Sequence, residues 1–223
     1  MDVFELVKSR RSVRSYVDKE IPQEIVEKLN AEIIECNRLG DLNMQLVLND
    51  RNAFGGMKAN YGLLKGVTNY IVMVGKKSVD LSERLGYYGE RVVLKAQELG
   101  LNTCWVGMSL IYNDTKGAYV VNDGESKKLI IAIGYGENQG HPRKTKSIEE
   151  VSVSYGDTPE WFKRGVECAL YAPTAMNQQK FKFYLYGDKV KIKYGLAVYG
   201  KVDKGIVKYH FELGAGKDNF TWL

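Results

Sequence analysis

The sequence predicts an α+β fold in which two copies of one helix-and-strand unit follow each other. Helical and strand patterns of apolar residues alternate along all 223 residues. A hydrophobic content of 44% is enough to bury the core of one large domain or of two small ones. We expect a first half at residues 1–150, a shorter second half at residues 151–223, and one compact protein made from both.

The first half begins with two predicted helices and two predicted strands. Residues 2–9 have the pattern of a short helix, and Pro22 opens a longer one, because proline is tolerated in a first helical turn. The longer helix runs to Gly40 along one apolar stripe, which consists of Ile25, Val26, Leu29, Ile33 and Ile34. Strands are expected next at residues 44–48 and 69–75.

The strongest helical pattern of the chain follows these strands. Its apolar residues lie three or four positions apart, and they are Leu81, Leu85, Tyr88, Val92, Ala96 and Leu99. Gly100 stands where helices often end in a left-handed conformation. Strands are expected at residues 102–107 and 129–136, and the polar residues 137–150 indicate a long connection.

The second half is predicted to hold two helices on either side of a β-hairpin. The apolar residues Phe181, Phe183 and Leu185 alternate with polar ones, which is typical of a half-buried strand. In order, the elements are a helix from Pro159, strands at residues 181–186 and 190–194, a helix at residues 202–216 and a terminal segment at residues 219–223.

Three pairs of segments support the internal repeat. QEIVEKLNAEIIEC pairs with EWFKRGVECALY, MQLVLND with KFYLYGD, and VLKAQELGLNTCWVG with VKYHFELGAGKDNFTWL. The members of each pair match in type and order, although helix-and-strand proteins can show so loose a match by chance. Two copies of one unit would pack as the subunits of a dimer do.

Positive charge is concentrated in the second half. The net charge is +5, and the residues from Lys180 to Lys208 include eight lysines and two aspartates. Lysines interleaved with aromatic residues suit nucleic acid, so a basic nucleic-acid-binding module is one alternative. The period-two alternation favours a solvated strand face instead, because strand lysines commonly protect a sheet surface or edge. We therefore disfavour a nucleic-acid partner.

Other classes of protein are disfavoured by composition. The N-terminus reaches charged residues at once, and the apolar run at residues 129–133 is far too short to span a bilayer, so we expect a cytoplasmic protein without a membrane partner. The three cysteines are widely spaced, and only two histidines are present. We expect neither a disulfide framework nor a metal site, and no side chain is assigned as a catalytic acid, base or nucleophile.

Two segments carry groups suited to a ligand. SRRSVRSY, residues 9–16, offers guanidinium forks and hydroxyls for a phosphate or carboxylate, although basic residues at a helix end also complement the helix dipole. YAPTAMNQQKFKF, residues 171–183, places uncharged amides and a hydroxyl in a turn after Pro173. That turn suits either a plain connector or the edge of a neutral heteroaromatic ring. Arginines for a phosphate and amides for a ring indicate a nucleotide-like cofactor.

GYGENQG follows a predicted strand and imitates a dinucleotide-binding fingerprint. The polar HPRKTK comes after it in place of an apolar helix. We therefore disfavour a Rossmann-type site at this position.

Four segments together resemble the signature segments of the FMN-dependent nitroreductase family. They are SRRSVRSY, APTAMNQQKFKF, ELGLNTCWVG, and AIGYG followed by HPRKTKSIEEV. The resemblance implies an antiparallel-rich sheet flanked by helices, and dimers with FMN at the subunit interface. It also implies an oxidoreductase that takes hydride from NADH or NADPH and passes it to a nitro compound, a quinone or another flavin by ping-pong kinetics.

The resemblance assigns site residues by position. The residues expected at the FMN phosphate, ribityl chain and pyrimidine edge are Arg10, Arg11, Ser12 and Arg14. Those expected to complete the phosphate site are Arg143 and Lys144. Those expected along the flavin ring are Trp105, Val106 and Gly107. Those matching the segment that reaches FMN from the opposite subunit are Pro173, Thr174 and Asn177.

The sequence departs from the family pattern in one respect. The motif with Pro, Ser or Thr, and Asn usually lies soon after the arginine motif, where this chain has CNRLGDLNMQLV instead. Together with the internal repeat, this suggests that one chain folds as a pseudo-dimer, with residues 1–150 as the main FMN-binding part and residues 151–223 completing the site. We expect one FMN per chain and a monomer, with a homodimer as the weaker alternative. A flavin-free structural or regulatory relative of the same fold is a further alternative.

Overall fold

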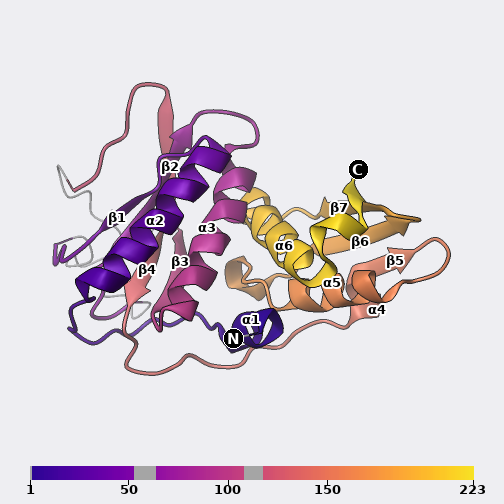
Figure 1. Ribbon diagram of the computed structural model, residues 1–223, viewed down its shortest axis with the longest axis horizontal. Coiled ribbons are helices and arrows are strands. Elements are labelled where there is room, and N and C mark those ends of the chain that lie inside the picture. Colours follow the sequence, from indigo (N-terminus) through magenta and orange to yellow (C-terminus); the bar gives the residue numbers. More distant parts are fainter. Residues whose placement is uncertain (1, 53–63, 108–117) are drawn as a thin grey trace. The chain divides into compact units, whose positions relative to one another are not determined.

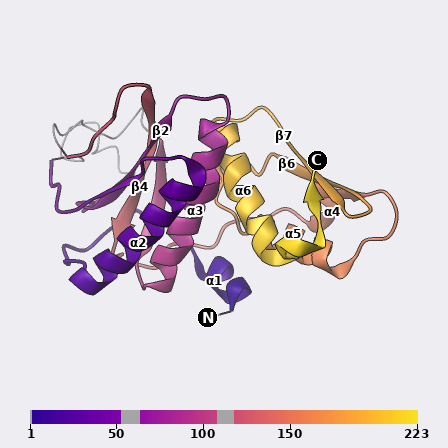
Figure 2. The same ribbon diagram turned by 45° about the horizontal axis from the view of Figure 1, so that its top comes forward.

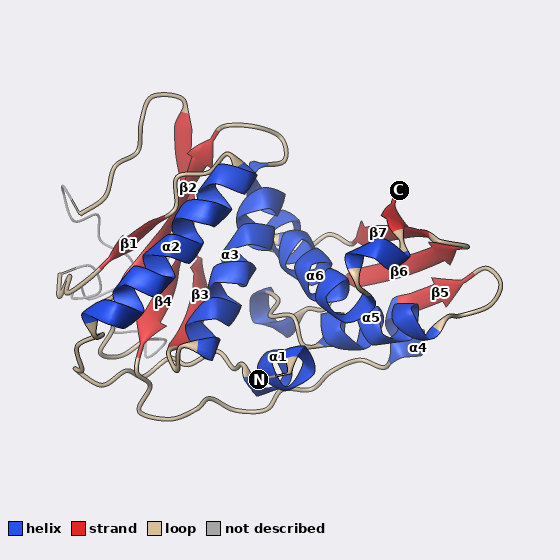
Figure 3. Ribbon diagram, in the orientation of Figure 1, coloured by secondary structure: helices blue, strands red, loops and turns tan. Residues whose placement is uncertain are grey.

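The structure is a computed structural model that describes residues 2–52, 64–107 and 118–223. Helices and strands are mixed along the chain, so the fold is α+β as predicted (Figure 3). The α-helices are α1 (Val3–Ser9), α2 (Gln23–Gly40), α3 (Leu81–Glu98), α4 (Ile148–Val151), α5 (Glu160–Leu170) and α6 (Gly200–Ala215). The strands are β1 (Gln45–Val47), β2 (Tyr70–Lys76), β3 (Asn102–Gly107), β4 (Glu125–Gly134), β5 (Ser152–Ser154), β6 (Phe181–Tyr186), β7 (Lys189–Tyr194) and β8 (Thr221–Trp222). Two short 3-10 helices are η1 (Ala175–Asn177) and η2 (Lys217–Asn219).

The chain forms two compact units, each with one four-stranded sheet. Unit 1 consists of Met1–Ser9, Ser82–Glu90 and Arg143–Leu223. Unit 2 consists of Arg10–Leu81 and Arg91–Pro142. Helix α3 is therefore divided between the two units. Within the described ranges, every helix is too short or too polar to cross a membrane.

Unit 2 is built on an antiparallel sheet with the strand order β1-β2-β4-β3. The residues of β2 from Tyr70 to Gly75 and those of β4 from Leu129 to Gly134 are all buried, so both faces of the sheet are covered. Over one face lie α2 and the second half of α3 (Figures 1 and 2). An ion pair between Glu32 and Arg91 joins these two helices. Continuous apolar runs are typical of strands that are buried on both faces.

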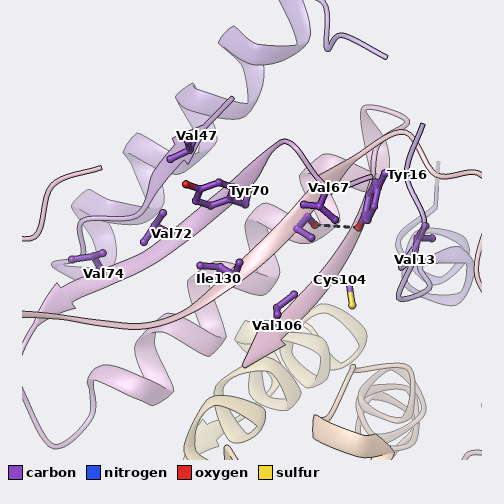
Figure 4. Close-up of a cluster of buried hydrophobic side chains, with 11 residues drawn as sticks. Val13, Tyr16, Val47, Val67, Tyr70, Val72, Val74, Cys104, Val106 and Ile130 are labelled. Carbon is purple, nitrogen blue, oxygen red and sulfur yellow. Dashed lines mark hydrogen bonds between the residues drawn. The ribbon is translucent and has the colours of Figure 1, made fainter. Parts of the chain in front are cut away.

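The other face of this sheet carries the hydrophobic cluster drawn in Figure 4. Its buried members are Val13, Tyr16, Val47, Val67, Tyr70, Val72, Val74, Cys104, Val106, Ile130 and Ala132. The hydroxyl of Tyr16 donates to the carbonyl oxygen of Ala132 at 3.4 Å, and burial raises the pKa of this hydroxyl. The segment around Val13 and Tyr16 is thus part of the core of unit 2, and this fixes the arginines beside it.

Unit 1 is built on a mixed sheet with the strand order β5-β6-β7-β8. Only the β6–β7 hairpin is antiparallel, because β5 runs parallel to β6 and β8 runs parallel to β7. The predicted alternation is confirmed in β6, where Phe181, Phe183 and Leu185 are buried and Tyr186 is exposed. Phe183 stacks on Phe211 of α6, with 4.6 Å between the ring centroids. The apolar face of this sheet therefore packs on the helices of unit 1.

Two glycines hold α6 close to its neighbours in unit 1. A Cβ atom on Gly205 would lie 2.0 Å from the carbonyl oxygen of Glu83 in α3, and one on Gly214 would lie 2.4 Å from that of Arg164 in α5. No side chain fits at these distances, so both helices contact α6 through backbone atoms. The imidazole Nε2 of His210 lies 2.8 Å from a Glu90 carboxylate oxygen, and both side chains are fully buried. Helix α6 is therefore fixed along its length.

Most predicted helices and strands are confirmed, and the differences concern β4, α4 and β5. Strand β4 begins at Glu125 rather than at residue 129, because its polar first residues pair with the end of β2. The polar stretch predicted as a connection contains α4, which starts with a capping box between Ser147 and Glu150. Strand β5 follows α4 directly. These elements are too short and too polar to give a periodic signal.

The order of elements agrees with the internal repeat. The series α2, β1, β2, α3, β3 corresponds in type and order to α5, β6, β7, α6, β8. In both series the first two strands are antiparallel. Strand β3 runs in the direction of β2, because both are antiparallel to β4, and β8 runs in the direction of β7. Within the described strands, β4 has no counterpart in the second series, and the pseudo-dimer stays a prediction.

Candidate functional site

The arginine-rich segment of unit 2 is an extended chain tied on both sides. The amide of Val13 donates to the carbonyl oxygen of Thr103 at 3.0 Å, and the amide of Tyr16 donates to that of Lys65 at 2.9 Å. The amide of Glu137 donates to the carbonyl oxygen of Ser15 at 2.9 Å. Backbone bonds to three separate parts of unit 2 leave this segment little freedom.

The side chains of this segment gather near Cys104 of β3. Arg10 is buried, Arg11 and Ser12 are half-buried, and Arg14 is exposed. Burial raises the pKa of the Cys104 thiol, while the charges of Arg14 and Arg10 and a hydrogen bond with Ser12 lower it. Arg10, Ser12 and Arg14 thus all lower the pKa of one buried thiol. The cluster concentrates positive charge at the start of β3.

Strand β3 lies at the edge of its sheet, so one side of it does not face β4. The carbonyl of Thr103 points to that side, because it accepts from Val13. Backbone groups alternate along a strand, so the amides of Trp105 and Gly107 point to the same side. The Val106 side chain points into the hydrophobic cluster (Figure 4). Val106 therefore packs the core, while the residues on either side of it direct amides away from the sheet.

The glycine-rich turn after β4 packs against the arginine segment. The amide of Gly136 donates to the side-chain oxygen of Asn102 at 2.9 Å. A Cβ atom on Gly140, which has a φ of +74°, would lie 2.6 Å from the Cβ atom of Arg11. Glycine is needed here for both backbone conformation and space. The turn with the fingerprint-like spacing therefore packs against the arginine segment.

A second set of predicted residues lies in unit 1, where residues 143–146 run beside residues 173–179. The side-chain amides of Asn177 and Gln179 both donate to the carbonyl oxygen of Lys144, at 2.9 and 3.0 Å. The guanidinium of Arg143 donates to the carbonyl oxygen of Leu170 at 2.9 Å. The Lys144 side chain is exposed. A hydrogen bond thus joins Lys144, which is predicted at the phosphate, to Asn177 of the segment that is predicted to reach FMN from the opposite subunit.

The Thr174 and Asn177 side chains are engaged within the segment itself. The hydroxyl oxygen of Thr174 accepts from the backbone amide of Gln179 at 3.1 Å, and the side-chain oxygen of Asn177 accepts from the side-chain amide of Gln179 at 3.0 Å. Pro173 is buried at the start of the segment. Three non-glycine residues, Met176, Asn177 and Gln179, have left-handed φ values of 50°, 54° and 45°. So many strained residues in so short a stretch are typical of functional segments.

Asp203 in α6 is a residue of this set that the sequence reasoning missed. Both of its carboxylate oxygens lie 3.1 Å from the amide of Ala175, and one accepts from the Tyr194 hydroxyl at 2.8 Å. Burial raises its pKa to about 6, and the hydrogen bonds from Tyr194 and Ala175 oppose this rise. In sequence, an acid in the first turn of a helix is ordinary, so no signal sets Asp203 apart.

The structure thus gathers the predicted residues in two sets, one in each unit. The set in unit 2 is Arg10, Arg11, Ser12, Arg14, Trp105, Val106 and Gly107. The set in unit 1 is Arg143, Lys144, Pro173, Thr174 and Asn177. The first offers positive charge and outward amides, and the second offers a hydrogen-bonded turn.

Solved structures of similar fold come from several bacteria. A "putative nitroreductase" from Thermotoga maritima is 22% identical, with a TM-score of 0.67 over 96% of this chain and 83% of that chain. A "putative nitroreductase in complex with FMN" from Desulfovibrio desulfuricans is 18% identical, with a TM-score of 0.52 over 68% of this chain and 96% of that chain. A "Putative NADH Oxidase" from Clostridium acetobutylicum is 18% identical, with a TM-score of 0.50 over 66% of this chain and 96% of that chain. These similarities show a nitroreductase-like fold.

A comparison with curated proteins gives no match. The family model described as "Putative TM nitroreductase" matches residues 2–215, which is nearly the whole chain. The match includes both units and both sets of predicted site residues. The chain therefore belongs to this nitroreductase family.

Proposed function

We propose that the protein is an FMN-dependent oxidoreductase that uses NADH or NADPH to reduce nitro compounds, quinones or flavins. Membership of a nitroreductase family supports a general oxidoreductase role. The observation that carries the proposal for FMN is the arginine segment, residues 10–14, which a hydrogen bond between Val13 and Thr103 fixes at the side of β3 that does not face β4. This arrangement places fixed positive charge next to outward backbone amides.

The chemistry of the donor set fits FMN. Its phosphate needs cationic donors, and the segment supplies guanidinium groups on a backbone that cannot move away. Among the described residues, Arg14 makes no ion pair, and its side chain is exposed. The polar edges of the ring need directed donors, and the amides of Trp105 and Gly107 are held in direction by the sheet. The same donors would also suit another planar cofactor that carries a phosphate. Membership of a nitroreductase family favours FMN over such a cofactor.

The roles of the residues follow from their positions. We assign Arg10, Arg11, Ser12 and Arg14 to the phosphate, the ribityl chain and the pyrimidine edge of FMN. We assign the segment of Trp105, Val106 and Gly107 to the flavin ring, with the amides of Trp105 and Gly107 as donors and the Val106 side chain in the core behind them. Bound FMN supplies the hydride-accepting and hydride-donating chemistry, and fixed positive charge near the pyrimidine edge favours its reduced, anionic form.

For the second set of residues we propose the roles that the family resemblance implies. Arg143 and Lys144 complete the phosphate contacts, and Lys144 is the exposed cation of the two. Pro173, Thr174 and Asn177 supply the contacts that a second subunit makes in the family pattern. We accordingly propose a pseudo-dimeric chain, monomeric in solution, with one FMN.

The first experiment is an absorbance spectrum of the purified protein before and after added FMN, with acid-released flavin identified. We expect flavin bands that correspond to one equivalent per chain. Two equivalents would contradict the pseudo-dimer, and a protein that stays colourless after reconstitution would favour a flavin-free relative of the same fold.

A matched pair of variants tests the arginine segment. Arg14→Gln should weaken FMN binding at least tenfold, because a hydrogen bond to a charged group contributes about 1.5–3 kcal/mol. Arg51→Gln is the control, because Arg51 is an exposed residue of the same unit that pairs with Asp18 at 2.7 Å. Equal affinity of both variants, measured by quenching of flavin fluorescence, would exclude the role assigned to Arg14.

A further inference from the structure

A buried carboxylate holds the segment at residues 173–179. Asp203 lies in the first turn of α6, and its exposure is 2%. It accepts from the Ala175 amide at 3.1 Å and from the Tyr194 hydroxyl at 2.8 Å. The carboxylate thus connects α6, β7 and the turn within unit 1.

The Ala175 amide is the first amide of η1 (Ala175–Asn177). Helix starts need acceptors for such amides, and the side chain of the preceding residue commonly accepts from the second or third of them rather than from the first. Here the preceding residue is Thr174, whose hydroxyl oxygen accepts from Gln179 instead. Asp203 therefore serves as the cap of η1 from another element. Without it, this amide would lose its acceptor.

The position of Asp203 is set by its own helix. Two residues further on, Gly205 packs against the carbonyl oxygen of Glu83, and Gly86 packs equally closely against that of Val202. These backbone contacts leave the first turn of α6 no room to shift. The capping carboxylate is therefore a fixed point to which the turn must conform.

The turn needs such a fixed point because its backbone is strained. Met176 and Asn177, both within η1, have left-handed φ values of 50° and 54°. A left-handed conformation costs a residue other than glycine about 1 kcal/mol or more. Hydrogen bonds that hold the turn offset this cost, and charged groups take part in those from Ala175 to Asp203 and from Lys146 to the carbonyl oxygen of Gln179.

Stability alone does not account for Asp203. Burial, the largest influence, raises its pKa from an ordinary value of 3.8 to about 6, so ionisation in the folded chain is unfavourable. A buried ionised group that weakens folding at neutral pH is typical of residues kept for function. Tyr194 is the titratable group that faces it, and burial also raises the pKa of that hydroxyl.

We infer that Asp203 is a positioning residue that holds residues 173–179 in the conformation that contacts the cofactor. This inference rests on the proposed function, since that function assigns Pro173, Thr174 and Asn177 to the flavin. Asp203 itself touches Ala175 and Tyr194, and it acts through them.

Three variants test the inference. Asp203→Ala removes the acceptor, and Asp203→Asn keeps an oxygen for the Ala175 amide while removing the charge. Glu212→Gln is the control, because Glu212 is also a buried acid of α6, and it contacts Trp222 and Tyr87 instead of the turn. Hydrogen exchange of the Ala175 amide is measured by NMR without flavin, and the Kd for FMN is measured by fluorescence titration.

We expect the Ala175 amide to exchange at least about tenfold faster in Asp203→Ala, with a Kd for FMN at least about tenfold higher. Asp203→Asn should restore both to within a few fold, and Glu212→Gln should change neither. Rescue by the isosteric residue separates positioning from general destabilisation.

The two readouts fail separately. Unchanged exchange of the Ala175 amide in Asp203→Ala would overturn the capping role, whether or not flavin binds. Faster exchange with an unchanged Kd would overturn the link between the turn and the cofactor. A wild-type chain that binds no FMN would overturn the proposed function and this link together, while the exchange measurement would still decide the capping role.

Discussion

The two sheets of this protein are buried in different ways. In unit 2, adjacent residues of β4 such as Ile130 and Ile131 are both fully buried, because helices cover one face and the hydrophobic cluster covers the other (Figures 1 and 4). In unit 1, Phe183 is fully buried and Lys182 beside it is not. The comparison teaches that the periodicity of a strand reports how many of its faces are covered.

The largest expected difference lies between neighbouring residues of β6. Phe183→Ala should lower the free energy of unfolding by about 3–5 kcal/mol, because it leaves a cavity between the sheet and Phe211. Lys182→Ala should change it by less than about 0.5 kcal/mol. Urea unfolding followed by tryptophan fluorescence measures both. Similar losses from the two changes would mean that the outer face of this sheet is covered.

Unit 2 should show no such alternation. Ile130 and Ile131 point to opposite faces of β4. Ile130→Ala and Ile131→Ala should each lower the free energy of unfolding by about 2–5 kcal/mol. The same urea titration applies. A loss below about 0.5 kcal/mol for either residue would contradict the coverage of both faces.

These contrasts explain which parts of the fold the sequence could predict. The apolar run of β2 and the alternation of β6 are local patterns, and both were interpreted correctly as strands. Strand pairing is not local, so the parallel pairing of β5 with β6 and of β8 with β7 has no sequence signature. The short α4 was missed because four residues cannot show a helical period.

The residues of the candidate site also differ in whether a local sequence pattern reveals them. The arginines at residues 10–14 were found because a dense cluster of one residue type is visible in the sequence. Their anchoring to Thr103 and Lys65 depends on contacts between distant segments. Asp203 was missed because its burial and its contact with Ala175 are tertiary properties. Sequence reasoning therefore finds ligand-contacting chemistry more readily than it finds the residues that hold it.

The buried acid Asp203 should give unit 1 a pH dependence of stability. The pKa of Asp203 is raised to about 6, so the folded chain holds its proton more tightly than the unfolded chain does. The stabilisation is complete below about pH 4 and is lost as the pH rises to about 6. The shift corresponds to at most about 3 kcal/mol.

Tryptophan positions allow this loss to be measured in unit 1. Trp161 and Trp222 belong to unit 1 and Trp105 to unit 2, so Trp105→Phe leaves a fluorescence signal from unit 1 alone. Urea unfolding of this variant between pH 4 and pH 7 should show the decline, and adding Asp203→Asn should remove it. A decline that persists with asparagine would assign the titration to another group.

The smallest expected effect concerns the open face of unit 1. Lys182 lies directly opposite Lys193 in the β6–β7 register, and like charges in this position repel each other. Lys182→Glu should therefore raise the free energy of unfolding by about 0.2–1 kcal/mol at low salt, because it creates an opposite-charge pair. Screening should reduce this gain at about 1 M salt.

A double-mutant cycle separates the pair from its surroundings. Adding Lys193→Glu to Lys182→Glu restores a like-charge pair and should cancel the gain, although it also removes the contact between Lys193 and the Tyr184 ring at 5.2 Å. Lys189→Glu is the control, because Lys189 faces Tyr186 and gains no partner. A solvated face tolerates these changes without loss of function. The contrary outcome would be a salt-dependent affinity for single-stranded DNA that Lys182→Glu abolishes. The face of the sheet that carries Lys182 would then be a binding surface for nucleic acid.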